Sequence, residues 1–241
     1  MSLVLPATLS DGQQAVLKVG FPHRESEHEG TALWLWNGNG AVRLLAEDEA
    51  RNALLLERLL PGTPLSQLGQ DAALDVMVEL LPRLWVPVDE PFRPLAVEAA
   101  WWADSMAETW ERAAEPFERE LLEAAVRALN QLAPTQGESV LLHQDLHADN
   151  VLRAEREPWL AIDPKPLAGE REFGIAALVR GFELGADRRD VVRRLDRLTD
   201  ELSLDRERAR GWALGQTLAW SFDSSYVGRH VQTARWLLEA P

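Results

Sequence analysis

The chain has 241 residues, of which 46% are hydrophobic and 27% are charged, and its formal net charge is −14. This length and balance predict a globular protein with one or two modest domains and exclude a disordered chain or a fibre. No apolar run approaches the roughly 20 residues that span a bilayer, and the negative charge disfavours nucleic acid and membrane surfaces as partners. Cysteine is absent and no targeting pattern opens the sequence, so we expect a cytoplasmic protein without disulfides or thiolate chemistry.

Lysine is rare in this chain. Of the 25 basic residues, only Lys18 and Lys165 are lysines, and the other 23 are arginines. Because lysine carries a compact charge on a flexible stem and arginine a planar fork, a site that needs the compact charge resists replacement by arginine. Both lysines are therefore candidate functional residues. For Lys165, which stands between two prolines, pairing with a surface carboxylate is favoured slightly over contact with substrate or phosphate.

Residues 1–60 predict a small β-rich lobe. Asp11-Gly12 between two extended runs is a hairpin signal, which places Lys18 near the end of the second strand. Pro61-Gly62-Thr63-Pro64 then breaks the chain and predicts a boundary with a second lobe, residues 61–241. The predicted elements of the first lobe are strands over 3–9 and 14–19, a helix over 25–36, and strands over 42–46 and 53–59.

Residues 61–241 predict a mainly helical lobe with a β-rich insertion. Apolar residues recur at helical spacing through most of this part, but between Ser139 and Ile162 they form short runs separated by polar loops. The predicted helices are over 66–84, 96–113, 116–132, 173–184, 187–202, 205–221 and 227–238, and the short strands over 140–142, 151–152 and 159–162.

The segment from His143 to Asn150 concentrates side chains that act as bases or ligands. It reads His-Gln-Asp-Leu-His-Ala-Asp-Asn and connects two short predicted strands, and Asp163 ends another apolar run thirteen residues later. A loop between short strands has little structural reason to gather such groups, so we interpret Asp145, Asn150 and Asp163 as one functional set. For each aspartate alone, a turn or helix-cap role is the alternative.

Phosphoryl transfer from a nucleotide explains this set. One carboxylate must orient the attacking hydroxyl and accept its proton, while a carboxylate and an amide oxygen hold Mg²⁺ on the phosphates. A lysine must neutralise the phosphates that are not transferred, and an acidic residue on a neighbouring helix holds that lysine. Lys18 and Glu29 fit this pair. Glu25 and Glu27 are competitors, although Glu27 points off the helix face that Glu25 and Glu29 share.

The pattern His143-x-Asp145-x-x-x-x-Asn150, followed by Ile162-Asp163, resembles the aminoglycoside phosphotransferase family. The stretches 17–29 and 159–166 resemble more narrowly its streptomycin 6-kinase and hydroxyurea phosphotransferase branch. The resemblance covers most of the chain. It implies an α+β, bilobal protein-kinase-like fold, with a β-rich N-terminal lobe and a mainly helical C-terminal lobe.

The resemblance also implies a role for each residue of the set. Asp145 would be the catalytic base, and Asn150 and Asp163 would bind Mg²⁺. Lys18 would contact the phosphates of ATP or GTP, and Glu29 would hold Lys18.

A hinge between the lobes is implied in the same way, with Leu56 as gatekeeper and the backbones of Glu57 and Leu59 meeting the adenine or guanine base.

The sequence departs from the family pattern at three places. Only one strand precedes the lysine strand, so we expect a truncated N-terminal lobe without the first strand and the phosphate-covering loop. Gln144 stands in place of glycine, where a positive φ would crowd the turn. Phe173-Gly174 stands where the family commonly has Phe-Asp or Tyr-Asp, so we expect the catalytic loop to lose a brace.

We therefore expect Mg²⁺-dependent transfer of the nucleotide γ-phosphate to a hydroxyl of a small cationic molecule, such as a streptomycin-like aminoglycoside, giving antibiotic resistance. Two alternatives stay open. One is a non-catalytic kinase-like binding protein or truncated relic. The other is a metal-dependent hydrolase built on His143-x-Asp145-x-His147.

Carboxylates outside the motif are candidate contacts for a guanidinium or ammonium substrate, with a solvated helix face as the favoured alternative. They are Asp104, Glu108, Glu111 and Asp223. The first strand would have an exposed edge, which predicts a monomer or a weak dimer formed through that edge.

Overall fold

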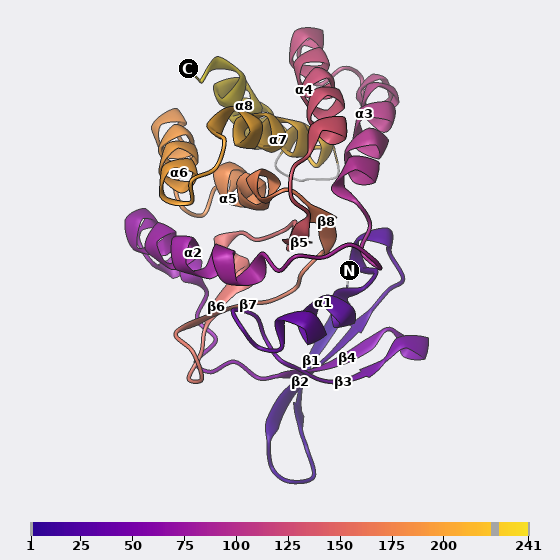
Figure 1. Ribbon diagram of the computed structural model, residues 1–241, viewed down its shortest axis with the longest axis vertical. Helices are drawn as coiled ribbons and strands as arrows, with labels where there is room; N and C mark the ends of the chain where they lie inside the picture. The colour runs from indigo at the N-terminus through magenta and orange to yellow at the C-terminus, as the bar shows by residue number, and fades with distance from the viewer. Residues whose placement is uncertain (1, 223–226, 241) are drawn as a thin grey trace.

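A computed structural model describes residues 2–222 and 227–240. Figure 1 shows two lobes, a small one built on an antiparallel sheet and a larger one built mainly of helices. This architecture confirms the predicted α+β class with a β-rich N-terminal lobe and a mainly helical C-terminal lobe.

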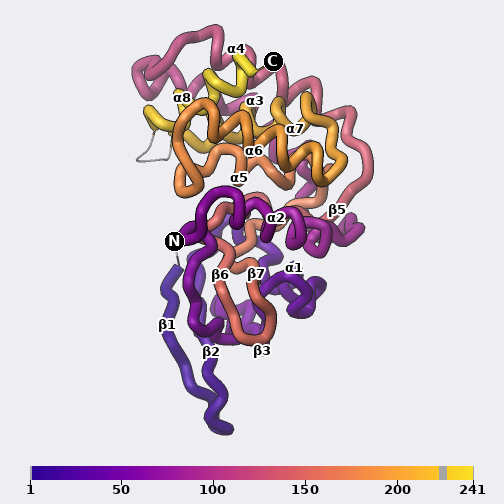
Figure 2. The backbone as a smooth tube through the Cα atoms, turned by 90° about the vertical axis from the view of Figure 1, so that its left-hand side faces the viewer, coloured from indigo at the N-terminus to yellow at the C-terminus, as the bar shows by residue number. Residues whose placement is uncertain are grey.

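The N-terminal lobe has one four-stranded antiparallel sheet in the order β1-β2-β4-β3. Gly12 has a φ of +88° in the β1–β2 turn, a conformation that glycine adopts without steric cost. The hairpin projects beyond the rest of the lobe, and β1 is an edge strand (Figure 2). Its residues Leu3, Val4 and Leu5 are exposed. Dimer formation through this edge stays a prediction. The strands are β1 (Ser2–Thr8), β2 (Gln14–Gly20), β3 (Leu44–Asp48) and β4 (Ala53–Glu57).

The helix of this lobe, α1 (Glu29–Trp36), begins four residues later than predicted. A short 3₁₀ turn at Arg24–Ser26 precedes it, and His28 has a φ of +63°, which breaks the helical path. Glu29 is therefore the first residue of α1, and Glu25 does not share a helix face with it. Buried Trp36 at the other end of α1 donates from Nε1 to the carbonyl of Leu84 and so ties α1 to the helical lobe.

The C-terminal lobe packs its helices around a continuous core of leucine, alanine and tryptophan side chains. The predicted helices over 187–202, 205–221 and 227–238 are confirmed within one or two residues at each end. Three predictions were too long. The helix expected over 66–84 begins at Gln70, and the helix expected from Pro116 begins at Arg119. The helix expected over 173–184 is a 3₁₀ turn followed by a five-residue helix. The helices are α2 (Gln70–Leu84), α3 (Leu95–Arg112), α4 (Arg119–Leu132), α5 (Ala176–Arg180), α6 (Arg188–Glu201), α7 (Arg206–Ala219) and α8 (Val227–Glu239).

Two small antiparallel sheets lie between the helices and the large sheet (Figure 1). They pair β5 (Val140–Leu142) with β8 (Leu167–Gly169), and β6 (Val151–Arg153) with β7 (Trp159–Ala161). The chain crosses from the first small sheet to the second after β5 and returns after β7. The loops 143–150 and 162–166 therefore run side by side. Within the described residues, no helix is long and apolar enough to cross a membrane.

Candidate active site

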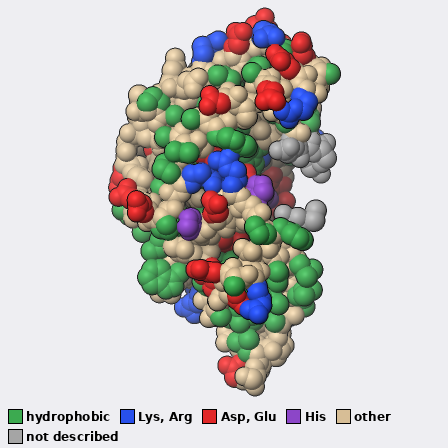
Figure 3. Space-filling model, turned by 90° about the vertical axis from the view of Figure 1, so that its right-hand side faces the viewer, with side chains coloured by type: hydrophobic (Ala, Val, Ile, Leu, Met, Phe, Trp, Pro, Cys, Tyr) green, Lys and Arg blue, Asp and Glu red, His purple; other side chains and the backbone are tan. Residues whose placement is uncertain are grey.

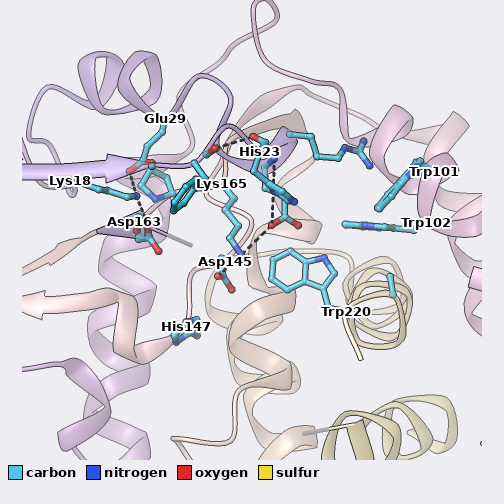
Figure 4. Close-up of a pocket in the computed structure, with 18 of the residues that line it drawn as sticks. Lys18, His23, Glu29, Trp101, Trp102, Asp145, His147, Asp163, Lys165 and Trp220 are labelled. Carbon is cyan, nitrogen blue, oxygen red and sulfur yellow. Dashed lines mark hydrogen bonds and ion pairs between the residues drawn. The ribbon is translucent and has the colours of Figure 1, made fainter. Parts of the chain in front are cut away.

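A cavity of about 940 Å³ opens where these two loops face the N-terminal lobe. Its wall combines Lys18 of β2, Trp101 and Trp102 of α3, and residues of both loops (Figure 4). The molecular surface is notched beside this region, and the face around the notch carries intermixed basic, acidic and hydrophobic side chains (Figure 3). Lys18, Glu29, Asp145 and Asp163 all line the cavity.

The backbones of the two loops are hydrogen-bonded at both ends. The N–H of Ile162 donates to the carbonyl of Asn150 at 2.9 Å, and the N–H of Lys165 donates to the carbonyl of His143 at 3.0 Å. Gln144 and Asp163 both have left-handed φ values, +63° and +58°. These two residues turn the chain beside the cavity. The positive φ expected at position 144 is therefore present, although the residue there is glutamine and not glycine.

Lys18 lies between two carboxylates on one side of the cavity. Its Nζ donates to Oε1 of Glu29 at 2.5 Å and also to Oδ1 of Asp163 (Figure 4). The side chains of Lys18 and Glu29 are buried, whereas that of Asp163 is 49% exposed and faces the cavity. The ammonium group of Lys18 on β2 thus binds one carboxylate from the first turn of α1 and one from the loop after β7.

The pKa values of this cluster reflect burial opposed by pairing. Burial acts to lower the pKa of Lys18, but Glu29 and Asp163 outweigh it and raise that pKa above its ordinary value. Burial acts to raise the pKa of Asp163, but the ammonium of Lys18 holds it below the usual range. Burial raises the pKa of Glu29 despite the opposing charge of Lys18. Asp163 is therefore ionised at neutral pH and offers the cavity a carboxylate.

Asp145 lies farther along the same wall, held by two cations. Nη2 of Arg180 donates to its Oδ1 at 3.1 Å, and Nζ of Lys165 lies 3.1 Å from its Oδ2. Lys165 also lies 3.5 Å from Oε2 of Glu25, and both cations sit over the ring of Trp220 at 4.5 Å from its centroid. Lys165 therefore pairs inside the cavity, and the slight preference for a surface partner was wrong.

Helix α7 and the segment after α5 brace the loop that carries Asp145. Nε2 of fully buried Gln216 donates to the carbonyl of Gln144 at 3.0 Å, and Oε1 of Glu183 accepts from the N–H of Ala148 at 2.9 Å. A Cβ atom at Gly174 would stand 2.7 Å from Nε1 of Trp85, so the tryptophan fills the space beside this glycine. The loop is held by Gln216 and Glu183 without an aspartate at position 174.

Asn150 and the hinge residues lie outside the set of residues that line the cavity. Nδ2 of Asn150 donates to the carbonyl of Asp145 at 2.9 Å, which leaves its amide oxygen as an acceptor. The carboxylate of Glu57 binds Arg156, and its N–H donates to the carbonyl of Arg43. Among residues 2–222 and 227–240, the N–H of Leu59 has no backbone acceptor.

The cavity wall carries equal numbers of positive and negative side chains. The lysines and arginines are Lys18, Arg24, Lys165 and Arg180, and the carboxylates are Glu25, Glu29, Asp145 and Asp163. The net charge of −14 is therefore not concentrated here. Asp104, Glu108 and Glu111 are exposed on α3 and do not line the cavity, and Asp223 lies outside the described residues.

The two histidines of the loop differ in their surroundings, since His143 is buried whereas His147 is partly exposed and lines the cavity. The ring of His143 is buried and stacks on Trp36, its Nε2 is 2.9 Å from the carbonyl of Ile162, and burial lowers its pKa to about 4. Nδ1 of His147 lies 3.9 Å from Glu183. Across the described part of the chain, no three His, Cys, Asp or Glu side chains are grouped to hold a metal ion, which gives the hydrolase alternative no ligand set.

Sequence reasoning missed Arg180, Trp220 and Gln216. One arginine among 23 carries no compositional signal, and tryptophan at helical spacing indicates core packing. Gln216 is polar but fully buried in α7, which only the packing of that helix reveals.

Comparison with known proteins gives consistent matches over nearly the whole chain. Residues 1–226 match the family model described as aminoglycoside/hydroxyurea antibiotic resistance kinase. A hydroxyurea phosphotransferase from Kitasatospora aureofaciens is 45% identical, covering 98% of this chain and 72% of the relative. A streptomycin 6-kinase from Streptomyces glaucescens is 43% identical, covering 90% of this chain and 73% of the relative.

Among solved structures, a choline kinase from Streptococcus pneumoniae aligns with a TM-score of 0.69 at 14% identity. The alignment covers 98% of this chain and 89% of the neighbour. It confirms the predicted protein-kinase-like fold.

Proposed function

The chain belongs to the family of aminoglycoside/hydroxyurea antibiotic resistance kinases, and from this premise we propose that it transfers the γ-phosphoryl group of ATP or GTP to a hydroxyl of a streptomycin-like aminoglycoside. Its class of activity is phosphotransfer to a hydroxyl group. The family description names antibiotic resistance, which fits phosphorylation of a drug.

The observation that carries the proposal is the placement of Asp145 and the Lys18–Asp163 pair on the wall of one cavity. Phosphoryl transfer needs an acidic group at the attacking hydroxyl and cationic groups at the phosphates. Here a carboxylate and a buried ammonium stand on the same wall, linked by two hydrogen-bonded loops. We assign Asp145 to the hydroxyl and Lys18 to the phosphates, with Glu29 holding Lys18.

The oxygen atoms near the phosphate side fit Mg²⁺. Asp163 offers an ionised and half-exposed carboxylate, and Asn150 has its amide oxygen left over once its nitrogen is bound to Asp145. Magnesium prefers such hard oxygen ligands and, when bound, neutralises charge on the phosphates. Asp163 and Asn150 would hold the ion. Leu59 has a backbone N–H without a backbone partner among the described residues, as a hinge donor to the nucleotide base requires.

In the proposed reaction, Asp145 orients the acceptor hydroxyl and takes its proton as the oxygen attacks the γ-phosphorus. The bond from that phosphorus to the bridging oxygen breaks, and the nucleoside diphosphate leaves with the electron pair. Arg180 holds one oxygen of Asp145, which fixes the direction of the other. Gln216 and Glu183 keep the loop backbone in place and so keep the distance from Asp145 to the phosphates constant.

Hydroxyurea is the competing acceptor. The alignment with the hydroxyurea phosphotransferase covers 98% of this chain. The cavity wall carries as many positive as negative side chains, which suits a neutral molecule as well as a cation. The streptomycin-type acceptor is preferred because Trp101, which is 50% exposed on the cavity wall, offers apolar surface to a sugar ring.

The test is nucleotide-dependent phosphorylation with each acceptor in turn. We expect streptomycin to increase diphosphate release from ATP or GTP in the presence of Mg²⁺. Asp145→Asn should lower kcat by about 10²–10⁴-fold, the usual contribution of general-base catalysis. Asp149→Asn is the matched control, because Asp149 lies in the same loop but binds Ser66 away from the cavity. Stimulation by hydroxyurea alone would move the assignment to the competing acceptor. Nucleotide binding without turnover on either would favour the non-catalytic alternative.

A further inference from the structure

Lys165 lines the same cavity as Asp145, and its Nζ lies 3.1 Å from Oδ2 of that carboxylate. We propose that its ammonium group is a second catalytic cation, which leaves Asp145 when the acceptor binds and then stabilises the phosphoryl group during transfer. This inference rests on the proposed function and adds a residue to which neither the motif nor the relatives' names assign a role. Its basis is the position of Lys165 relative to Asp145, Glu25 and Trp220.

The backbone of Lys165 is restricted, whereas its long side chain is partly exposed and has several partners within reach. Pro164 and Pro166 restrict the chain on both sides, and the N–H of Lys165 donates to the carbonyl of His143 at 3.0 Å. The side chain is 28% exposed and lines the cavity. A flexible four-carbon stem on a rigid attachment point lets the ammonium group reach several positions within the cavity and no farther.

Both carboxylate oxygens of Asp145 are occupied before any acceptor binds. Arg180 takes Oδ1 and Lys165 takes Oδ2 (Figure 4 labels Lys165 and Asp145). An acceptor hydroxyl must donate its proton to one of these oxygens. Each oxygen can accept a second hydrogen bond, but withdrawal of one cation leaves more room for the hydroxyl beside that oxygen. Arg180 is the fixed one, because its side chain is only 11% exposed. Lys165 is the one that can move, since Glu25 at 3.5 Å and the face of Trp220 hold the ammonium group nearby without trapping it.

The position of Asp145 then determines where the phosphoryl group lies. The acceptor oxygen must come within about 2.6–3.2 Å of the base, and the phosphorus within about 3–3.5 Å of that oxygen. The distance from Oδ2 of Asp145 to the transferring phosphorus is therefore at most roughly the sum of these two distances. An ammonium group that starts 3.1 Å from Oδ2 needs a displacement of only a few ångströms to contact the phosphoryl oxygens.

Lys18 is poorly placed for this task. Its ammonium group is already bound by Glu29 and Asp163, on the side of the cavity that we assign to the nucleotide. The negative charge of the transferring group is spread over three oxygens and develops beside the acceptor, where a second cation stabilises it. In the transfer step, the proton of the acceptor hydroxyl goes to Asp145. The phosphorus loses its bond to the bridging oxygen and gains a bond to the acceptor oxygen, while Lys165 gives up no proton.

The absence of cysteine allows a direct test by chemical rescue. Lys165→Cys introduces the sole thiol of the chain, and alkylation with 2-bromoethylamine then rebuilds an ammonium group on a stem of nearly the original length. We expect kcat of the unmodified variant to fall by about 10²-fold or more with KM for the nucleotide little changed, and alkylation to restore most of it. Wild-type protein treated with the same reagent is the control.

A second measurement separates contact with the phosphoryl group from positioning of Asp145. ADP with Mg²⁺ and aluminium fluoride mimics the transferring phosphoryl group, whereas ADP with Mg²⁺ alone does not. We expect Lys165→Cys to lose affinity for the first combination and to keep affinity for the second. Equal loss of both, full activity of the unmodified variant, or failure of alkylation to rescue would overturn the inference. Absence of transfer by the wild-type protein would instead refute the proposed function, so the two failures are distinguishable.

Discussion

Lys18 joins two carboxylates from distant parts of the chain, Glu29 of α1 and Asp163 of the loop after β7. We expect Lys18→Met to lower the free energy of unfolding by about 3 kcal/mol, because it leaves the buried Glu29 charge without its partner. The loss should be at the lower end of the usual range for buried pairs, since Asp163 is half exposed and can be solvated.

Adding Glu29→Gln to Lys18→Met should recover part of that stability without restoring activity, because a neutral amide removes the uncompensated charge. Urea unfolding of the single and double variants measures both effects. Additional destabilisation by the second substitution would show that Glu29 does not depend on Lys18 for its charge balance.

His143 gives the protein a stability that depends on pH. Burial lowers the pKa of this ring to about 4, whereas the unfolded chain binds the proton near 6.5. Between these values the unfolded state carries more protons, so the free energy of unfolding decreases as the pH falls from 7 to 4, by about 3 kcal/mol from this residue. His230, whose pKa is also lowered to about 4, acts in the same direction.

The contribution of His143 is isolated by comparing the wild type with His143→Gln across this pH range. The variant should be less stable at pH 7, where it loses the packing of the ring on Trp36, but its unfolding free energy should change less with pH. Parallel curves for the two proteins would contradict the assignment of a buried neutral imidazole.

At the residue scale, sequence patterns could predict those parts of the candidate site that are unusual in composition. Lys18 was noticeable because lysine is rare, and Asp145 and Asp163 because polar groups gather between apolar runs. The pairing of Lys165 with Asp145 was not predictable, because it depends on two loops crossing side by side through backbone hydrogen bonds.

The 3₁₀ segment Arg171–Ile175 and the end of α2 are packed together through Gly174 and Trp85. Because an added Cβ would stand 2.7 Å from Nε1 of the indole, we expect Gly174→Ala to destabilise the protein by about 1–3 kcal/mol. In a Trp85→Phe background the cost should shrink, because the phenyl ring lacks the indole nitrogen. Thermal unfolding of the two single variants and the double variant measures the coupling.

Gly228→Ala is the matched control for this prediction. Gly228 lies in α8, and among the described residues no atom outside its chain neighbours and its own helix backbone comes within 4 Å of its ideal Cβ position. Alanine there should be neutral or stabilising by up to about 1 kcal/mol, because it favours the helix without meeting a neighbour. Equal destabilisation by both substitutions would indicate a backbone effect and not a clash with Trp85.

At the element scale, hydrophobic periodicity predicted most helices but misplaced some of their ends. The pattern of residues 25–36 continues without interruption, yet His28 adopts a left-handed conformation and the helix starts only at Glu29. Such a break depends on how the segment is held from outside, by the ion pairs Arg24–Glu98 and Glu27–Arg93 to the helical lobe, which local spacing does not encode.

Those ion pairs link the two lobes of the molecule. Buried Glu98 of α3 places one carboxylate oxygen 2.7 Å from both Arg24, which precedes α1, and Arg93. Burial raises the pKa of Glu98, and the two guanidinium groups oppose this shift. The carbonyl of Arg24 also accepts from Arg93 at 2.6 Å. The segment between β2 and α1, which forms part of the cavity wall, is thereby anchored to the helical lobe.

Removing this anchor should affect the whole molecule. We expect Glu98→Ala to destabilise the protein by roughly 2–4 kcal/mol, less than for a fully buried pair because both arginines keep some solvent contact. Glu108→Ala on the same helix is the control, since its pair with Arg112 is exposed and should contribute little. Urea unfolding compares the two. Similar small effects would mean that the lobes do not depend on Glu98.

The net charge of −14 acts at the scale of the molecule and not of the cavity, whose wall is balanced. Composition disfavours nucleic acid and membrane surfaces as partners, which stays a prediction, and it does not determine how charge is distributed over the folded surface. The position of Lys165 beside Asp145 also makes the neighbourhood of the base partly cationic. A cationic acceptor would therefore be expected to place its charge away from the reacting hydroxyl.

The most direct test of phosphoryl transfer is ³¹P NMR spectroscopy of the wild-type protein with ATP, Mg²⁺ and streptomycin. We expect loss of the γ-phosphate signal and growth of a phosphomonoester signal on the antibiotic, with neither change in Asp145→Asn. Growth of inorganic phosphate in place of the phosphomonoester, or an unchanged rate in Asp145→Asn, would contradict this expectation.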